Sequence, residues 1–255
     1  MPVTETVDDG IAEVVMDNPP VNALTVADAR HLAELFASYR DRAEVRVAIL
    51  TAVGKGFSAG IDIKEYQDAP GHEIVVESGA ACHAAFGAVH DCAVPVIAAV
   101  QDFCLATGVG LAGSADVVIA SKNATFGLPE VDNGALGVGT HLARLVPTQR
   151  MRHMFYTCEK ATAEELAGYG SVLEVTEPDE LMDRARAVAA TIAAKSPTVI
   201  RAAKRALLGI EPVDVHRAYR YEQGFTYELN LLGEGDKARD AFVRGERRGG
   251  GDPSS

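Results

Sequence analysis

Short apolar runs alternate with helical segments through the first half of this chain, and few folds accept that order. Val45 to Thr51, Val94 to Val100 and Asp116 to Ala120 are rich in β-branched and small apolar residues, which is typical of buried strands. Between them, Glu73 to Asp91 and Leu105 to Gly113 read as helices. This alternation predicts an α/β fold with a largely parallel sheet.

The N-terminal segment carries local signals of its own. Val3 to Val7 and Ile11 to Met16 alternate apolar and polar residues on either side of an Asp-Asp-Gly turn, which predicts a β-hairpin. Thr25 is placed to cap a helix from Val26 to about Arg42, with Asp28 as its capping-box partner. We therefore expect a hairpin and a capped helix before the first buried strand.

The pattern becomes helical after Val175. Helical periodicity recurs in four segments: Glu180 to Lys195, Pro197 to Leu208, Pro212 to Leu231 and Asp236 to Arg247. We expect a core over residues 1–195 that holds the ligand site, and a helical region over residues 196–248. Residues 249–255 are expected to form a disordered tail.

Charge and cysteine content argue against several classes of protein. The 255 residues carry a formal net charge of −12, which opposes binding to nucleic acid or to anionic membranes. The four cysteines have no metal-ligand or C-x-x-C spacing, so we expect reduced thiols and no metal site. The sequence shows neither a signal peptide nor an apolar membrane span, and we expect a cytoplasmic protein.

Two short motifs point to other classes of enzyme. Gly56 to Gly60 matches G-x-S-x-G, in which Ser58 would be the nucleophile of a serine hydrolase, but the preceding strand ends too early for a nucleophile elbow. Gly108 to Gly113 matches G-x-G-x-x-G of nicotinamide-binding folds. There the ribose-binding acid should end the next strand, and Glu130 lies well beyond that strand. Neither context supports its motif.

Two loops that join a strand to a helix, Gly54 to Glu65 and Phe103 to Gly108, hold the residues best suited to chemistry. Their small residues leave backbone N–H groups available to a ligand oxygen at the start of a helix. Two such donors from separate loops form an oxyanion hole, which suits a thioester whose α-proton is weakly acidic. The residues alone leave a second interpretation open, two tight turns with glycines kept for packing.

Three motifs resemble those of one family. They are F-S-A-G-I-D-I-K-E (57–65), P-V-I-A-A-V-x-x-F-C-x-x-x-G (95–108) and F-G-L-P-E-V (126–131), in the order and approximate spacing of the crotonase (enoyl-CoA hydratase/isomerase) superfamily. The resemblance covers nearly the whole chain. It implies a ClpP/crotonase-like α/β fold, a superhelix of ββα turns with a C-terminal helical region for trimerisation. It also implies an acyl-CoA substrate, no separate cofactor, and a homotrimer or a hexamer.

Positions that match these motifs give candidate site residues. The oxyanion donors fall on the backbone N–H groups of Ile61 and Thr107, and Glu130 matches the family's catalytic glutamate. The resemblance also gives candidate CoA contacts: Ala59, Ile61, Asp62, Ile63, Lys64 and Thr107, with Lys237 and Arg244 as weaker candidates. Asp62 is expected to fix its loop through backbone hydrogen bonds. Structural roles are favoured for four further residues: His83, His90, Asp132 and His141.

The chain departs from the family at position 110. Hydratases of this family use two glutamates, and the second would stand where this sequence has Gly110. Glu130 is then the single acid/base, which favours chemistry that needs one base. Isomerisation and hydrolytic C–C cleavage of a cyclic β-keto acyl-CoA are two such reactions.

A closer resemblance concerns four separate blocks, including the C-terminal helices. All four are similar to actinobacterial crotonases of steroid catabolism: G-F-S-A-G-I-D-I-K-E-Y (56–66), T-F-G-L-P-E-V-D-N-G-A-L-G (125–137), V-I-R-A-A-K-R-A-L (199–207) and Y-R-Y-E-Q-G-F-T-Y-E-L-N-L (219–231). Members of that group open a ring of a bicyclic keto acyl-CoA, so ring-opening C–C hydrolysis is the expected reaction. An enoyl-CoA hydratase or isomerase proper is one alternative, and a non-catalytic acyl-CoA-binding protein is another.

Overall fold

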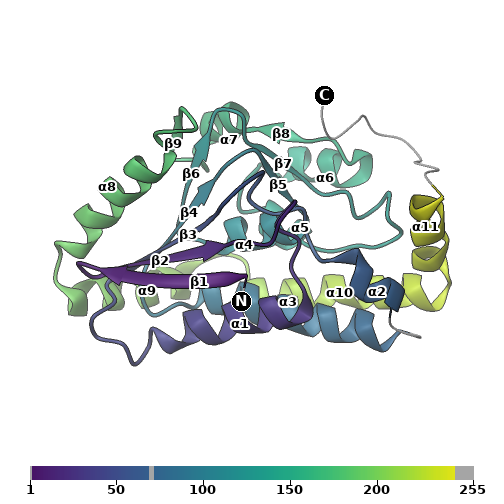
Figure 1. The fold of residues 1–255 in the computed structure, drawn as a ribbon, viewed down its shortest axis with the longest axis horizontal. Coiled ribbons are helices and arrows are strands. Elements are labelled where there is room, and N and C mark those ends of the chain that lie inside the picture. Colours follow the sequence, from purple (N-terminus) through teal and green to yellow (C-terminus); the bar gives the residue numbers. More distant parts are fainter. Residues whose placement is uncertain (1, 69–71, 245–255) are drawn as a thin grey trace.

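A six-stranded sheet in the order β1-β2-β3-β4-β6-β9 runs through the centre of the computed structural model (Figure 1), which describes residues 2–68 and 72–244. Its strands are β1 (Val3–Asp8), β2 (Ile11–Met16), β3 (Val47–Ala52), β4 (Val96–Val100), β6 (Val117–Ser121) and β9 (Glu174–Thr176). All neighbours pair in parallel except β1 and β2, which form the predicted hairpin. The α/β class expected from the sequence is confirmed.

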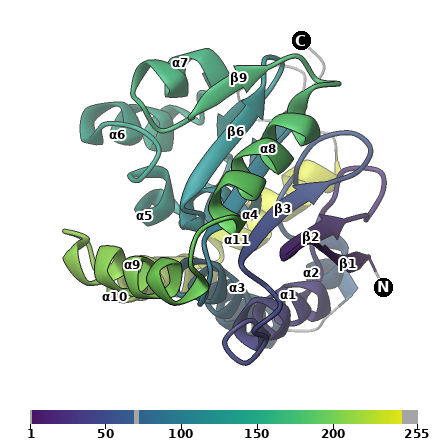
Figure 2. The same ribbon diagram turned by 90° about the vertical axis from the view of Figure 1, so that its left-hand side faces the viewer.

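Helices cover both faces of this sheet, which explains why its central strands are almost wholly apolar. Along β3, Ala48 and Leu50 belong to the larger core, which includes α1 (Val26–Ser38), α3 (Glu73–His90) and α4 (Thr107–Ser114). The alternate residues Val47 and Ile49 belong to a second core against α8 (Leu181–Ala193). Figure 2 shows α8 lying across that face of the sheet. A strand with both faces buried lacks the alternation of apolar and polar residues that is seen when one face meets solvent.

The predicted capping box begins α1. The Thr25 hydroxyl accepts a hydrogen bond from the Asp28 N–H, and the Asp28 carboxylate accepts one from the Thr25 N–H. The helix ends at Ser38, short of the predicted end near Arg42. There the chain turns toward β3, and the Arg42 guanidinium binds the Glu5 carboxylate at 2.8 Å. Arg42, which forms this ion pair with Glu5, therefore lies in the turn after the helix and not in its last turn.

A second, three-stranded sheet was not predicted. It contains β5 (Phe103–Leu105), β7 (Thr125–Gly127) and β8 (Ala161–Thr162), which are too short to show a periodic pattern. A β-bridge joins Cys104 of β5 to Ser58, so this sheet holds the loop after β3 beside the loop before α4. The two loops singled out in the sequence are thus fixed next to each other.

Two C-terminal helices, α9 (Pro197–Ile210) and α10 (Val215–Leu231), lie on the same side of the molecule as α1 and α3, and α11 (Glu234–Val243) stands at the end of α10 (Figure 1). All three are close to the predicted segments. The rest of the last predicted helix, and the predicted tail over residues 249–255, lie outside the described residues. The remaining helices are α2 (Ile63–Asp68), α5 (Gly139–Leu142), α6 (Thr148–Thr157) and α7 (Ala163–Gly168).

Candidate active site

A cavity of about 220 Å³ brings together residues from five separate parts of the chain. Five of the predicted site residues line it: Ala59, Ile61, Ile63, Thr107 and Glu130. The other walls come from α3, from the segment 133–138, and from α10. The helical region after residue 195 therefore contributes directly to the cavity.

The first candidate donor is the backbone of Ile61. Leu24 holds the loop on both sides of this residue, because its N–H donates to Gly60 O at 2.8 Å and its carbonyl accepts from Asp62 N at 2.9 Å. The Ile61 N–H has no acceptor among the described residues. Gly60 has a φ of +113°, which glycine adopts without strain. The loop is thus fixed with one N–H left unpaired.

The second candidate donor is the backbone of Thr107, the first residue of α4. The first N–H groups of a helix have no acceptor within the helix, and the Thr107 N–H has none elsewhere in the described chain. A β-carbon placed on Gly60 would lie 3.9 Å from the Thr107 nitrogen. The two unpaired N–H groups therefore belong to adjoining loops that line one cavity, as an oxyanion hole requires.

Glu130 supplies the carboxyl group of the cavity. The residue is half-buried, but its Oε2 has no contact with solvent and no hydrogen-bond partner among the described residues. Burial raises the pKa of Glu130 to about 8, and the nearby charge of Glu222 adds to this effect. A carboxyl group with a pKa near the working pH can both accept and return a proton.

The aromatic ring of Phe86 explains the glycine at position 110. A β-carbon there would lie 2.6 Å from Phe86 Cε1, closer than carbon atoms approach. The ring is itself held by Tyr219 and His141, with centroids 5.3 Å and 4.8 Å away. Position 110 thus has no room for any side chain, which the sequence did not indicate.

The histidines and Asp132 lie outside the cavity lining. His141 is fully buried, and burial together with the Arg144 charge lowers its pKa to about 3, so the ring is neutral. His83 stacks on Tyr219, with ring centroids 6.1 Å apart. Asp132 is exposed. None of these residues lines the cavity, and a structural role for Asp132 stays a prediction.

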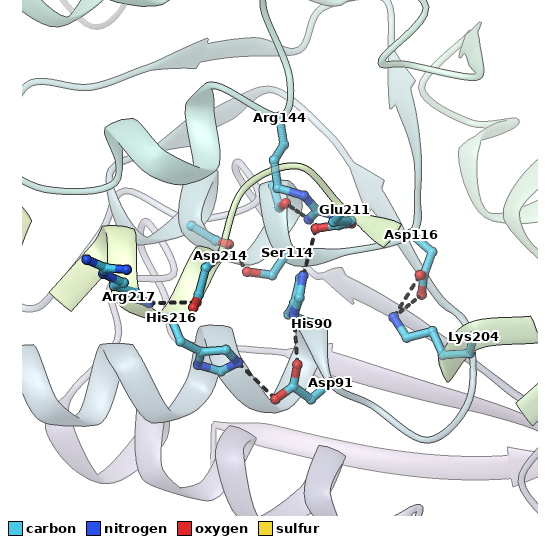
Figure 3. Close-up of polar contacts among 12 residues, drawn as sticks. His90, Asp91, Ser114, Asp116, Arg144, Lys204, Glu211, Asp214, His216 and Arg217 are labelled. Atoms are coloured by element: carbon cyan, nitrogen blue, oxygen red, sulfur yellow. Dashed lines mark hydrogen bonds and ion pairs between the residues drawn. The ribbon is translucent and has the colours of Figure 1, made fainter. Parts of the chain in front are cut away.

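An ion-pair network fixes α10 against α3 (Figure 3). His90 Nδ1 lies 2.8 Å from Asp91 Oδ1, and its Nε2 lies 3.1 Å from Glu211 Oε2. Asp91 also binds His216 Nε2 of α10 at 2.9 Å, and Arg144 binds Glu211 at 2.7 Å. The ligand atoms of His90, Asp91 and His216 lie within 4.8 Å of one another, a grouping that could hold a metal ion and that the sequence did not predict.

The polar side chains of α10 form the wall that the sequence analysis missed. Five of them line the cavity: Tyr219, Gln223, Thr226, Tyr227 and Asn230. Their spacing places them on one face of a helix, and this spacing was the available signal. The sequence offered no means of telling which neighbour that face would contact.

The two competing motifs have structural explanations. Ser58 is fully buried, and its hydroxyl donates to Asn22 O at 2.8 Å and accepts from Gly60 N at 3.1 Å. It does not line the cavity, so the nucleophile interpretation is wrong. Gly108 to Gly113 lies inside the fully buried α4, where a β-carbon at Gly113 would lie 2.5 Å from His141 O. These glycines serve close packing.

The candidate CoA contacts are only partly gathered by the cavity. Asp62 accepts a hydrogen bond from the Lys64 N–H at 3.0 Å, which is the predicted role in its loop. The Lys64 side chain is exposed, and Lys237 is exposed and paired with Glu234 at 2.7 Å. Neither lysine lines the cavity.

Comparison with known proteins identifies relatives along nearly the whole chain. Residues 6–243 match the sequence profile of the family described as Enoyl-CoA hydratase/isomerase. A Rhodococcus jostii protein named "(7aS)-7a-methyl-1,5-dioxo-2,3,5,6,7,7a-hexahydro-1H-indene-carboxyl-CoA hydrolase" is 52% identical over 244 residues, covering 95% of each chain. A Mycobacterium tuberculosis protein of the same name is 50% identical over 245 residues, covering 96% of this chain and 99% of its own.

The fold is shared with solved structures. An enoyl-CoA hydratase from Mycobacterium avium subsp. paratuberculosis superposes with a TM-score of 0.85 at 25% identity, covering 99% of both chains. The ClpP/crotonase-like fold expected from the motifs is thereby confirmed. No helix within residues 2–68 and 72–244 is long and apolar enough to cross a membrane.

Proposed function

The chain belongs to the enoyl-CoA hydratase/isomerase family, and we propose that it hydrolyses a carbon–carbon bond of a cyclic keto acyl-CoA. The observation that carries this proposal is the Phe86 ring over Gly110. It leaves Glu130 as the single carboxylic acid among the described residues that line the cavity. One carboxyl group suits a reaction in which one base acts twice.

In the proposed reaction the thioester oxygen accepts hydrogen bonds from the Ile61 and Thr107 N–H groups. The Glu130 carboxylate takes a proton from a water molecule whose oxygen adds to a ketone carbon of the ring. The bond from that carbon to its neighbour then breaks, and its electron pair passes into an enolate that the two N–H groups stabilise. Glu130 returns the proton to carbon, so the product gains one water and no cofactor is consumed.

The relatives support this choice of reaction over hydration. Two proteins at 50% identity or more are named hydrolases of an indene-carboxyl-CoA that carries two keto groups. We propose the same class of substrate here, a steroid-derived bicyclic keto acyl-CoA. An enoyl-CoA hydratase or isomerase, and a non-catalytic acyl-CoA-binding protein, are the competing functions.

One experiment separates these functions. Purified wild type and Glu130→Gln are each given crotonyl-CoA and the CoA thioester of the dioxo-indene acid that names the relatives. Ring opening by the wild type that the variant lacks supports the proposal. Rapid hydration of crotonyl-CoA would assign a hydratase, and no turnover of either thioester would favour a binding protein.

We further propose that the protein assembles as a trimer, or as a pair of trimers, through α9 and α10. Large apolar side chains on these helices are exposed, among them Ile210 at 76% and Tyr221 at 73%. An apolar surface of this kind is covered in stable oligomers. Light scattering on the purified protein tests the assembly.

Free cysteines and a CoA-linked substrate fit a cytoplasmic site of action. Lys64 and Lys237 remain the proposed phosphate contacts.

A further inference from the structure

Most polar side chains that α10 presents to the cavity are already paired. Gln223 Nε2 donates to Gly79 O at 2.5 Å, and Gln223 Oε1 accepts from Arg220 at 3.0 Å. The Thr226 hydroxyl bonds to the backbone of Leu136, and Asn230 Nδ2 donates to Thr226 O at 2.8 Å. These contacts hold the wall in place and leave little hydrogen-bonding capacity for a ligand.

Tyr227 differs from its neighbours on this wall. Its hydroxyl has no contact with solvent and no hydrogen-bond partner in the part of the chain that is described. The nearby Gly79 carbonyl already accepts from Gln223. Buried hydroxyl groups are nearly always paired, so an unpaired one in a cavity calls for an explanation.

The neighbouring helix makes room for this hydroxyl. A β-carbon on Gly79 would lie 2.6 Å from the Tyr227 oxygen, so any larger residue at position 79 of α3 would displace the Tyr227 hydroxyl. One turn further along α3, Cys82 Sγ lies 4.0 Å from Thr107 Oγ1, beside the second oxyanion donor. The Tyr227 hydroxyl and the Thr107 hydroxyl thus contact α3 at residues that lie about one helical turn apart along its axis.

We propose that Tyr227 determines specificity by donating a hydrogen bond to a keto oxygen of the acyl group that is remote from the thioester. This inference rests on the proposed function, because it assigns a buried, unpaired donor of the cavity a part in binding the proposed substrate. The Ile61 and Thr107 N–H groups serve the thioester oxygen, and Glu130 serves water and the transferred proton. A simple enoyl chain has no oxygen for Tyr227, whereas a diketone does.

A site built to bond a substrate oxygen discriminates against analogues that lack it, because its own polar group is then left unpaired. We therefore expect Tyr227→Phe to lower kcat/KM for the dioxo-indene thioester roughly 10- to 100-fold. For an analogue in which the remote ketone is replaced by a methylene, kcat/KM should change less than about threefold. The preference of the wild type for the diketone should disappear in the variant.

Tyr156→Phe is the matched control, because Tyr156 is exposed on α6, away from the cavity. Thermal denaturation shows whether Tyr227→Phe keeps the fold. Equal losses on both thioesters, or no loss on either, would overturn the assignment of Tyr227.

A binding measurement keeps this test separate from the proposed reaction. Calorimetry compares the affinity of Glu130→Gln and of the Glu130→Gln/Tyr227→Phe double variant for the same two thioesters. If the wild type opens neither ring, the proposed reaction fails, while this comparison still decides the role of Tyr227. Weaker binding of the diketone alone in the double variant supports the role, and unchanged binding of both thioesters refutes it.

Discussion

The Phe86 ring occupies the space that a side chain at Gly110 would need, since a β-carbon there would lie 2.6 Å from Phe86 Cε1. Both residues belong to one packed layer with Tyr219 and His141. A glutamate at position 110 and the Phe86 ring in its present place therefore exclude each other. This packing conflict stands in the way of a two-glutamate arrangement.

A glutamate introduced at position 110 should destabilise the fold and should not produce hydratase activity. We expect Gly110→Glu to lower the free energy of unfolding by about 1–3 kcal/mol or more, because the core around Phe86 is overpacked. Hydration of crotonyl-CoA should not appear. Thermal denaturation and a hydration assay check this, with Gly168→Glu as the control because nothing lies within 4 Å of a β-carbon at that glycine. A stable, hydrating Gly110→Glu enzyme would contradict our view of Phe86.

Glu130 should weaken the fold at neutral pH. Its pKa is about 8 when folded and near 4.5 when unfolded, so stability falls as pH rises from 4.5 to 8, where only the folded state keeps the proton. Glu130→Gln removes this cost and should stabilise the protein by roughly 3 kcal/mol at pH 7. Urea unfolding at pH 5 and pH 7 measures the difference. A variant less stable than wild type at pH 7 would show that the carboxyl group is not held protonated.

The same pKa predicts the pH dependence of turnover. If Glu130 acts first as a base, kcat/KM should rise about tenfold per pH unit below pH 8 and level off above it. The reason is that only the ionised carboxylate can take a proton from water. Steady-state rates between pH 6 and pH 9.5 test this. A rate that falls with rising pH across this range would mean that Glu130 acts first as an acid.

His90 should make a second pH-dependent contribution to stability. Burial alone would lower its pKa, but the hydrogen bonds to Asp91 and Glu211 raise it above the ordinary value. The charged ring therefore stabilises the fold fully below pH 6.5, and this contribution is lost as pH rises through the raised pKa. His90→Gln should lower stability at pH 6 more than at pH 9. Urea unfolding of wild type and variant at the two pH values measures the difference, and an equal loss at both would contradict the role given to the charged ring.

Much of the fold followed from local patterns. The central strands could be recognised because both of their faces are buried, and the capping box of Thr25 and Asp28 involves residues only three apart. The short strands of the second sheet escaped notice because Phe103–Leu105 and its partners are held by pairing with distant segments. Propensity within three residues cannot report such pairing.

The sequence predicted the residues of the site that lie in recognisable motifs, but not those that the packing of the helices brings to it. Ile61, Thr107 and Glu130 lie in motifs that can be recognised in the sequence, and all three line the cavity. Phe86 and Tyr227 could not be found, because their importance depends on Gly110 and Gly79, residues far away in the chain. In the sequence, the available sign of these contacts is the glycine at positions 79 and 110. Which side chain fills the space beside each glycine is decided by how α3 packs against α4 and α10.

The position of α10 separates the residues that carry out the proposed reaction from many of those that contact the acyl group. Ile61, Thr107 and Glu130 all precede residue 131, whereas Tyr219 to Asn230 form the opposite wall on one helix. Substitutions of the cavity-lining residues of that helix can change which molecules fit without replacing Ile61, Thr107 or Glu130, as long as Glu222, whose charge helps raise the pKa of Glu130, is kept. The contacts that select the acyl group are thus concentrated on one continuous helix, and a chimaera that takes residues 215–231 from a relative, with Glu222 retained, should change substrate preference in a single step.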